Sequence, residues 1–146
     1  MKGVLHLGSV FAIVLRMRAG GTARFPSTAR LKKRTDFKRV YSEGRRRVGR
    51  YFTLFVLPTG NEGRIGIVVS RRFGKAVIRN RVKRQVREAF RLNRPRFYGY
   101  DIVVVPREEC KGKTTEAIAH ALVSEMEAAV ASIEVRKDGK ESDISD

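Results

Sequence analysis

A run of basic side chains between residues 79 and 94 is the part of this sequence best suited to chemistry with an anion. Seven Lys and Arg stand there against a single acid, Glu88. At helical spacing such like charges repel one another by roughly 0.2–0.5 kcal/mol per pair. Arg predominates, and its planar guanidinium binds phosphate through paired hydrogen bonds. The run therefore indicates a surface that binds a polyanion, although a charge run usually forms only a solvated face.

Four aromatic side chains, Phe37, Tyr41, Tyr51 and Phe55, are interspersed with basic residues. Any one of them is more typical of a hydrophobic core than of a binding surface. Together with the basic residues, however, they resemble the stacking platforms that bind unpaired bases. No helix-turn-helix or zinc-finger motif favours duplex DNA. The combination therefore favours RNA or a single strand as the polyanion.

Several catalytic and metal-binding chemistries are excluded. The glycines of Gly66…Gly74-Lys75 are too far apart for a phosphate-binding loop, and Ala76 stands where Ser or Thr would bind magnesium. One cysteine, Cys110, excludes an internal disulfide, and only two histidines, His6 and His120, exclude clustered Cys/His zinc sites. No Ser-His-Asp or paired-carboxylate arrangement is plausible. We therefore expect no catalytic residue, no metal site and no nuclease activity in this chain alone.

The charge of the chain points to the same kind of partner. Its 146 residues fit one domain, and 42% hydrophobic residues suffice for one core. The net charge is +17, and residues 24–96 hold 23 basic residues against four acids, a local net charge of +19. Such an imbalance indicates a nucleic acid or an anionic membrane surface. A membrane is disfavoured, because the apolar stripe of the basic helix is better used in the core.

The elements that must position these residues follow from periodicity and turn signals. Residues 82, 86, 89 and 90 recur on one side of a helix over 75–93, so the basic side chains occupy its outer side. The other expected elements are a short helix after a Thr35-Asp36 N-cap and closed by Gly44, a basic loop over 45–50, a strand over 51–57, an antiparallel partner strand over 64–70, a central strand over 101–106, and a helix from Thr115 to about Ile133.

The two ends of the chain differ from the rest. Residues 1–23 contain an apolar run too short to span a bilayer. They are interpreted as an N-terminal extension or the result of a start placed before Met17, and less readily as a signal peptide, because Arg16 and Arg18 stand where a cleavage site should be neutral. Residues 134–146 lack apolar periodicity and are predicted to be a disordered tail. The domain is therefore placed at 24–133.

The string from Gly66 to Glu88, GIVVSRRFGKAVIRNRVKRQVRE, closely resembles the signature of the bacterial ribonuclease P protein subunit family. Its centre, Arg79-Asn80-Arg81, is similar to that family's RNR motif. Supporting matches are Arg30-Leu31-Lys32-Lys33 with Asp36-Phe37, the strand over 51–57, and Asp101 to Arg107. The resemblance covers about residues 24–133. It leaves a structural RNA-binding protein, such as a ribosomal protein, as the alternative.

This resemblance implies a fold and a division of labour. The fold would be an α/β (α+β) two-layer sandwich, a mixed central sheet packed by helices, with the RNR helix in a left-handed βαβ crossover against the usual right-handed rule. Catalysis would belong to a partner RNA that uses Mg²⁺, with no dedicated metal site on the protein. The protein would bind this catalytic RNA and the 5′ leader of precursor tRNA, in the cytoplasm and away from any membrane.

The resemblance also implies site residues, which we take over position by position. The RNR helix would bind RNA through Arg79, Asn80, Arg81, Lys83, Arg84, Arg87 and Arg91. A cleft lined by Phe37, Tyr41 and Phe55 would bind the single-stranded leader, with Tyr41 standing where Phe is common in the family. Additional basic contacts are expected from Arg30, Lys33, Arg71, Arg72 and Lys75.

Overall fold

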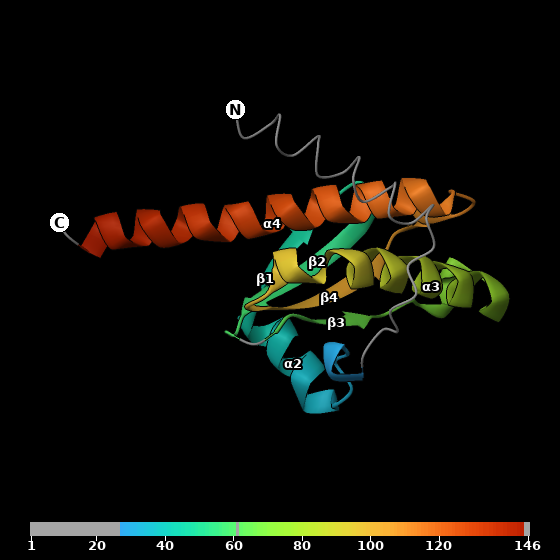
Figure 1. Ribbon diagram of the computed structural model, residues 1–146, viewed down its shortest axis with the longest axis horizontal. Helices are drawn as coiled ribbons and strands as arrows, with labels where there is room; N and C mark the ends of the chain where they lie inside the picture. The colour runs from blue at the N-terminus through green and yellow to red at the C-terminus, as the bar shows by residue number, and fades with distance from the viewer. Residues whose placement is uncertain (1–26, 61, 145–146) are drawn as a thin grey trace.

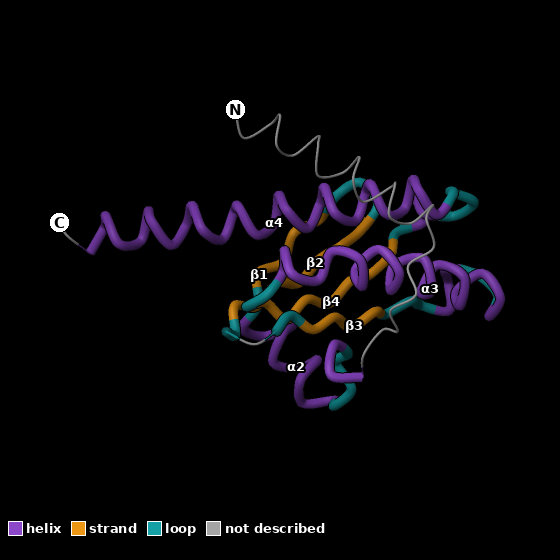
Figure 2. The backbone as a smooth tube through the Cα atoms, in the orientation of Figure 1, coloured by secondary structure: helices purple, strands orange, loops and turns teal. Residues whose placement is uncertain are grey.

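The structure is a computed structural model that describes the backbone of residues 27–60 and 62–144 and the side chains from Thr28 to Glu134, Asn61 excepted. The predicted extension over residues 1–23 lies outside the described residues. Four strands form one mixed sheet in the order β1-β2-β4-β3 (Figure 2). Their bounds are β1 (Arg45–Val48), β2 (Phe52–Pro58), β3 (Arg64–Ile67) and β4 (Tyr100–Pro106).

Helices cover both faces of this sheet (Figure 1). On one face, α3 (Ala76–Asn93) and α4 (Thr115–Ile144) enclose the main core, whose largest fully buried side chains include Phe52, Phe90 and Phe97. On the other face, α2 (Arg34–Glu43) encloses a smaller cluster built on Leu31, Val40, Leu57 and Val103. The expected mixed sheet packed by helices is confirmed, with α2 as the helix of the second face.

The connection from β3 through α3 to β4 has the unusual handedness that the resemblance implied. These two strands are parallel neighbours. In Figure 1 both run from left to right, α3 lies in front of the sheet, and β4 lies above β3. With the helix toward the viewer, a right-handed crossover would place the second strand on the other side. The left-handed βαβ crossover is therefore present.

The pairing of the strands corrects one sequence prediction. The strand that begins at Arg64 was expected to pair antiparallel with β2, but β2 and β3 both pair with β4, antiparallel and parallel respectively. The reason is the apolar run over 102–105, which must be covered on both sides and therefore takes the centre of the sheet. The strand also ends at Ile67 instead of Ser70, although the Val68 N–H still donates to Val104 O at 3.0 Å.

A second correction concerns the segment after α2, which was predicted to be a basic loop. Residues 45–48 instead form the edge strand β1, paired antiparallel with β2. The Arg45 guanidinium donates to the Ser132 carbonyl of α4 at 3.3 Å, which anchors the start of the strand. Arg side chains on an edge strand discourage pairing with another chain. The sequence could not reveal this strand, because residues 45–48 are three Arg and one Val and lack the alternation of apolar and polar residues that predicts a strand.

The helices begin and end near the predicted residues, with two differences. Helix α2 starts at Arg34, after an extended Lys33 that makes no side-chain cap, so Thr35-Asp36 is not the N-cap. Asp36 instead lies in the first turn, where its charge suits the helix dipole. Helix α4 continues past Ile133 to Ile144, across the predicted disordered tail. The sequence over 134–144 contains no Pro, and Glu, Lys and Arg within it are good helix formers.

Candidate nucleic-acid interface

Helix α3 holds the RNR motif on the side that faces away from the core. Val82, Val86, Ala89 and Phe90 are buried against the sheet and α4, which fixes the rotation of the helix. The helix begins after an extended Lys75 and ends at Asn93, whose amide donates to Ala89 O at 2.7 Å. The predicted helix over 75–93 is thus confirmed, and its rotation turns the basic residues of its first three turns outward.

The RNR-motif residues and the basic residues after them divide into two rows according to exposure. The row nearer the core, spaced by one helical turn, is half-buried and consists of Arg79, Lys83 and Arg87. The outer row, Asn80, Arg81 and Arg84, is exposed. Partial burial lowers the pKa of the Arg87 guanidinium, and the positive charge of nearby Arg30 lowers it further. The fold therefore brings Arg30, which is distant in sequence, to the same surface.

The end of the helix differs from its beginning in how its charges are compensated. Arg91 pairs with Glu88 and has only a 7% exposed side chain, Arg94 lies 3.7 Å from Glu62, and Arg96 lies 2.7 Å from Glu127. Within the described part of the chain, the ion pairs leave no acidic partner for Arg79, Arg81, Lys83, Arg84 or Arg87. The available positive charge is thus concentrated in the first three turns, and Arg91 lies apart from it.

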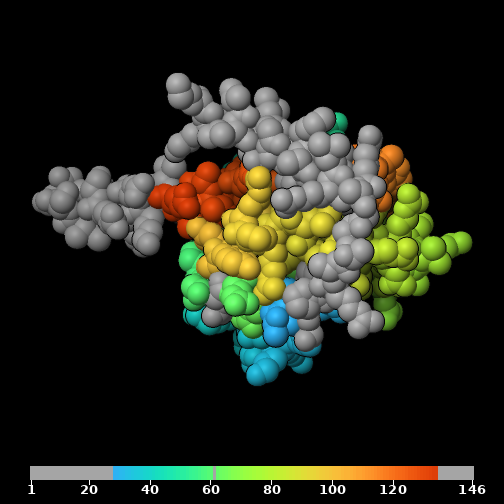
Figure 3. Space-filling model, in the orientation of Figure 1, coloured from blue at the N-terminus to red at the C-terminus, as the bar shows by residue number. Residues whose placement is uncertain are grey.

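The segment before α3 extends this charged surface. A single 3-10 turn over Arg71–Phe73 is held by the buried Phe73 ring, which leaves Arg71 and Arg72 exposed. Lys75 follows, also exposed, at the start of the helix. In Figure 3 this part of the chain, in yellow-green, forms the right-hand edge of the molecule. We call these residues together with the two rows of α3 the basic face.

The second surface, which we call the aromatic cleft, lies on the opposite face of the sheet beside α2. One row of directly opposed residues crosses all four strands there: Arg46, Phe55, Val103 and Gly66. Directly opposed residues project to the same face, so Phe55 lies between a basic edge and an apolar centre. The next row, Val48, Thr53 and Val105, continues the floor, and Val48 is 54% exposed.

Two aromatic side chains of α2 project over this floor. The Tyr41 ring meets the Phe55 ring edge to face, with centroids 4.7 Å apart, and Tyr41 is 41% exposed. Partial burial raises the pKa of the Tyr41 hydroxyl. The Phe37 ring lies against Gly66, where a Cβ would come within 2.7 Å of its Cζ atom. The three predicted cleft residues therefore lie on the same side of the sheet, and each is partly buried and partly exposed.

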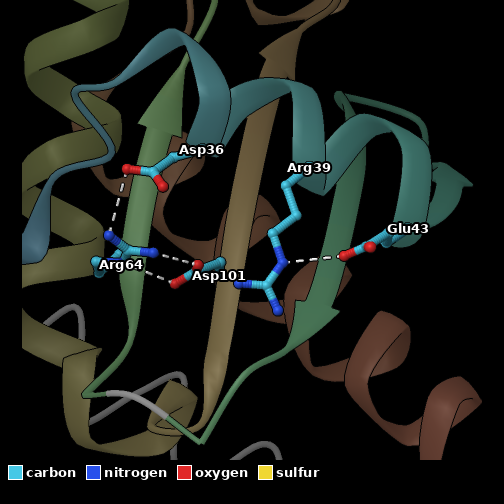
Figure 4. A network of polar contacts seen from close by, with 5 residues as sticks. All are labelled: Asp36, Arg39, Glu43, Arg64 and Asp101. Carbon is cyan, nitrogen blue, oxygen red and sulfur yellow. Dashed lines mark hydrogen bonds and ion pairs between the residues drawn. The ribbon is translucent and has the colours of Figure 1, made fainter.

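A buried ion pair fixes α2 over the sheet. The Asp101 carboxylate is 2% exposed and accepts two hydrogen bonds from Arg64, at 3.0 Å from Nε and 2.6 Å from Nη2. Asp36 of α2 lies 3.5 Å from the same guanidinium (Figure 4). Arg64 thus ties the first turn of α2 to β3 and β4. The Arg39–Glu43 pair, also in Figure 4, lies on the exposed side of α2 and contributes little to the stability of the fold.

The structure also corrects the set of aromatic candidates and adds to the cleft. Tyr51 packs against the main core on the α4 side, so it does not join the other three rings. Sequence reasoning missed Arg46, Val48 and Gly66. The Arg45-Arg46-Arg47 run was a signal for Arg46 alone, and it became informative only once the strand register placed Arg46 beside Phe55.

Other kinds of site find little support in the described part of the chain. No group of three or more His, Cys, Asp or Glu there could hold a metal ion. Among residues 27–60 and 62–144, no helix is both long and apolar enough to cross a membrane. The described residues thus present cations on one side of the sheet and partly exposed aromatic rings on the other, groups of the kinds that contact phosphates and bases.

Comparisons with known proteins agree with this geometry. A family model described as Ribonuclease P matches residues 25–130. The ribonuclease P protein component of Caldanaerobacter subterraneus subsp. tengcongensis is 44% identical over 100 residues, 67% of this chain and 83% of that protein. The corresponding protein of Clostridioides difficile is 40% identical over 100 residues, 64% of this chain and 85% of that protein.

Solved structures agree as well. The RNase P protein from Thermotoga maritima has a TM-score of 0.60 and 38% identity, covering 65% of this chain and 92% of that one. The Staphylococcus aureus RNase P protein has a TM-score of 0.63 and 33% identity, covering 69% of this chain and 96% of that one. Since the matched residues contain both the basic face and the aromatic cleft, this chain belongs to the ribonuclease P protein family.

Proposed function

We propose that this chain is the RNA-binding protein subunit of ribonuclease P, the endoribonuclease that removes the 5′ leader from precursor tRNA. The observation that carries the proposal is the pairing of an uncompensated basic face on α3 with a half-exposed aromatic cleft beside α2. Phosphate contacts position an RNA regardless of sequence, whereas exposed rings stack on unpaired bases. The two surfaces therefore suit two RNA partners that the protein holds at once.

In this proposal the basic face binds the catalytic RNA, and the aromatic cleft binds the single-stranded leader. Arg79, Lys83, Arg84 and Arg87 contact backbone phosphates of the catalytic RNA. Arg46 neutralises a leader phosphate while leader bases stack on Tyr41. Mg²⁺ acts on the catalytic RNA, and none of the side chains that the structure describes is assigned to hold it. The complex works in the cytoplasm, without contact to a membrane.

The division of labour predicts that the pure protein does not cut precursor tRNA. Metal-assisted hydrolysis needs groups that hold a metal ion or activate water. Among the side chains from Thr28 to Glu134, Asn61 excepted, no suitable group of acids and histidines meets. Correct cleavage by RNA-free protein would overturn this assignment.

The cleft is tested by comparing two substrates. Phe37→Ala and Tyr41→Ala each remove a ring, and base stacking on a ring contributes about 1–3 kcal/mol. We expect each variant to weaken the binding of precursor tRNA with a leader by roughly tenfold, and to leave mature tRNA almost unaffected. Circular dichroism and thermal melting establish that the variants are folded. An equal loss for both substrates would return these rings to a purely structural role.

The basic face is tested through salt dependence. The Arg79→Ala, Lys83→Ala, Arg87→Ala triple variant should bind the catalytic RNA with a flatter dependence on salt. Removing one phosphate contact reduces the log–log slope by about 0.7–0.9, because fewer counterions are released. An unchanged slope in a folded variant would remove this face from the interface.

Reconstitution separates the proposal from its alternative, a structural RNA-binding protein of the ribosome. The purified chain should restore the cleavage of precursor tRNA by the cognate catalytic RNA at low magnesium. A ribosomal protein of similar charge serves as the matched control, because it supplies positive charge without the aromatic cleft. Equal stimulation by both proteins would show that charge alone is responsible, which would favour the alternative.

A further inference from the structure

A separate hollow of about 280 Å³ opens on the flank of α3 that faces the loop before α4. This loop follows a 3-10 turn over Glu108–Cys110 and leads into Thr115. Apart from the Gln85 amide, the side chains around the hollow are either apolar or cationic. The apolar ones are Phe73, Ile78, Val82 and Cys110, and the cationic ones are Arg81, Lys111 and Lys113.

The loop that forms one wall is held firmly against α3. Gln85, which is 6% exposed, donates from Nε2 to Lys113 O and to Thr115 Oγ1, both at 3.3 Å. The Lys113 N–H donates to Cys110 O at 3.3 Å, and Gly112 has φ +72°, which favours glycine. A buried amide and a left-handed glycine thus shape the wall before any ligand arrives.

The hollow combines charge with accessible apolar surface. Ile78 is 42% exposed although it lies in the wall, so a ligand could cover it. Neither Arg81 nor Lys113 pairs with an acid in the described part of the chain. Lys111 lies 3.6 Å from Glu108 and 5.4 Å from the centre of the Phe73 ring. The arrangement suits a flat, weakly polar group that carries a negative charge at one end.

We propose that this hollow binds one unstacked nucleotide of the RNA that occupies the basic face. The base packs against Ile78 and the edge of Phe73, and its phosphate lies between Arg81 and Lys113. Arg81 belongs to both surfaces, so an RNA strand that leaves the outer row of α3 reaches the hollow without a gap in positive charge. This inference rests on the proposed function, since it assigns a further contact to the same RNA.

Three small ligands test the hollow directly, on the full chain and without the catalytic RNA. Uridine 5′-monophosphate, uridine and inorganic phosphate are titrated while backbone amide and methyl resonances are recorded by NMR. We expect the nucleotide to give saturable shifts at Gly112, Lys113 and the Ile78 methyl groups. Phosphate should shift the loop amides only, and uridine should bind more weakly than the nucleotide. Equal shifts from the nucleotide and phosphate, spread over all basic residues, would overturn the proposal.

Two variants localise the effect within the hollow. Ile78→Trp fills the space without changing charge, and should abolish the nucleotide shifts at Gly112 and Lys113. The variant is checked for folding by circular dichroism and by the unchanged resonances of the aromatic cleft. Persistence of the nucleotide shifts in a folded Ile78→Trp variant would place the ligand elsewhere and contradict the proposal.

The second variant, Lys113→Gln, distinguishes this inference from the proposed function through binding to the catalytic RNA. It should flatten the salt slope by about 0.7–0.9, the value for one phosphate contact. Lys32→Gln, which removes an exposed lysine beside α2, is the matched control and should leave the slope unchanged. If Arg84→Ala flattens the slope and Lys113→Gln does not, only the hollow is refuted. If neither variant has an effect, the proposed function fails as well.

Discussion

Replacing Gly66 with alanine tests whether the position of the Phe37 ring in the aromatic cleft requires a residue without a side chain at position 66. Gly66 lies in β3, directly beneath the Phe37 ring of α2. A Cβ atom there would stand 2.7 Å from Phe37 Cζ and 3.2 Å from Leu31 Cδ1. Real Cβ contacts are longer than the first of these distances, and the Leu31 methyl is a flexible tip. The Gly66→Ala variant must therefore displace the Phe37 ring.

The size of the effect follows from two opposing contributions. Overpacking of a filled site costs about 1–3 kcal/mol. Replacing glycine by alanine in a compatible backbone restricts the unfolded chain and stabilises by about 0.4–1 kcal/mol. Gly66 has an ordinary extended backbone, so this gain is available. We expect Gly66→Ala to lower the free energy of unfolding by about 0.5–2 kcal/mol.

A double-mutant cycle isolates the contact between the ring and the glycine. In a Phe37→Ala background the overpacking disappears, so Gly66→Ala should there stabilise the protein by about 0.4–1 kcal/mol. Urea unfolding of the four proteins measures each free energy. The expected result is thus a reversal of sign between the two backgrounds. A similar loss of stability in both backgrounds would show that Phe37 is not what requires glycine at this position.

The same variant has a functional consequence. A displaced Phe37 ring alters the aromatic cleft while every charged side chain stays in place. Gly66→Ala should therefore weaken the binding of precursor tRNA with a leader more than that of mature tRNA, without changing the salt dependence of either. A loss that shrinks as the salt concentration rises would instead indicate a disturbed phosphate contact and would contradict this reasoning.

Three further variants or measurements probe groups outside the basic face and the aromatic cleft. Asp101→Asn breaks the buried pair with Arg64 and should lower the free energy of unfolding, measured in urea, by about 2–3 kcal/mol. This value is in the lower part of the range for breaking a buried ion pair, because the Arg64 side chain is 25% exposed. A change below 0.5 kcal/mol (roughly the noise of such comparisons) would refute this expectation. Burial raises the pKa of the Glu125 carboxyl, so its contribution is fully present below the unfolded pKa and is lost as pH rises through the folded pKa. The thermal stability of the natural chain relative to Glu125→Gln should therefore fall from pH 4 to pH 7 (about the range that spans an ordinary and a raised Glu pKa), and a difference that rises over that range would contradict this sign. Burial raises the pKa of the Cys110 thiol to about 12, so a disulfide reagent near neutral pH should react with it only after unfolding, and rapid reaction of the native protein would show an accessible thiolate.

Apolar patterns in the sequence predicted the helices and strands that bury apolar side chains. They did not predict the features that depend on tertiary contacts, which are strand β1 and the pairing of β3. The helix over 76–93 and the central strand over 100–106 carry strong apolar periodicity or an apolar run, and both were found within one residue of their expected bounds. Strand β1 has no such signal, because it is stabilised by backbone pairing with β2 and by the contact of Arg45 with α4. The turn residues over 59–63 predicted a hairpin, which is why β3 was expected beside β2.

The two surfaces were predictable to different degrees. The basic face follows from helical spacing alone, since the apolar residues of α3 fix which side turns outward. Spacing could not show that Arg91 is paired with Glu88, because the choice between a pair and an open charge depends on side-chain conformation. The aromatic cleft needed the register of four strands, which sets Phe55 beside Arg46 and places Gly66 under Phe37.

The left-handed crossover explains how both surfaces can exist in one small domain. A right-handed connection between β3 and β4 would carry α3 across the opposite face of the sheet, where α2 and the aromatic floor lie. The basic helix would then cover Phe55 and Val105, and the aromatic cleft would not form. The left-handed route instead places α3 beside α4, on the face of the main core (Figure 1). The basic face and the aromatic rings are thereby kept on opposite sides of β4, as the proposed binding of two RNA segments requires.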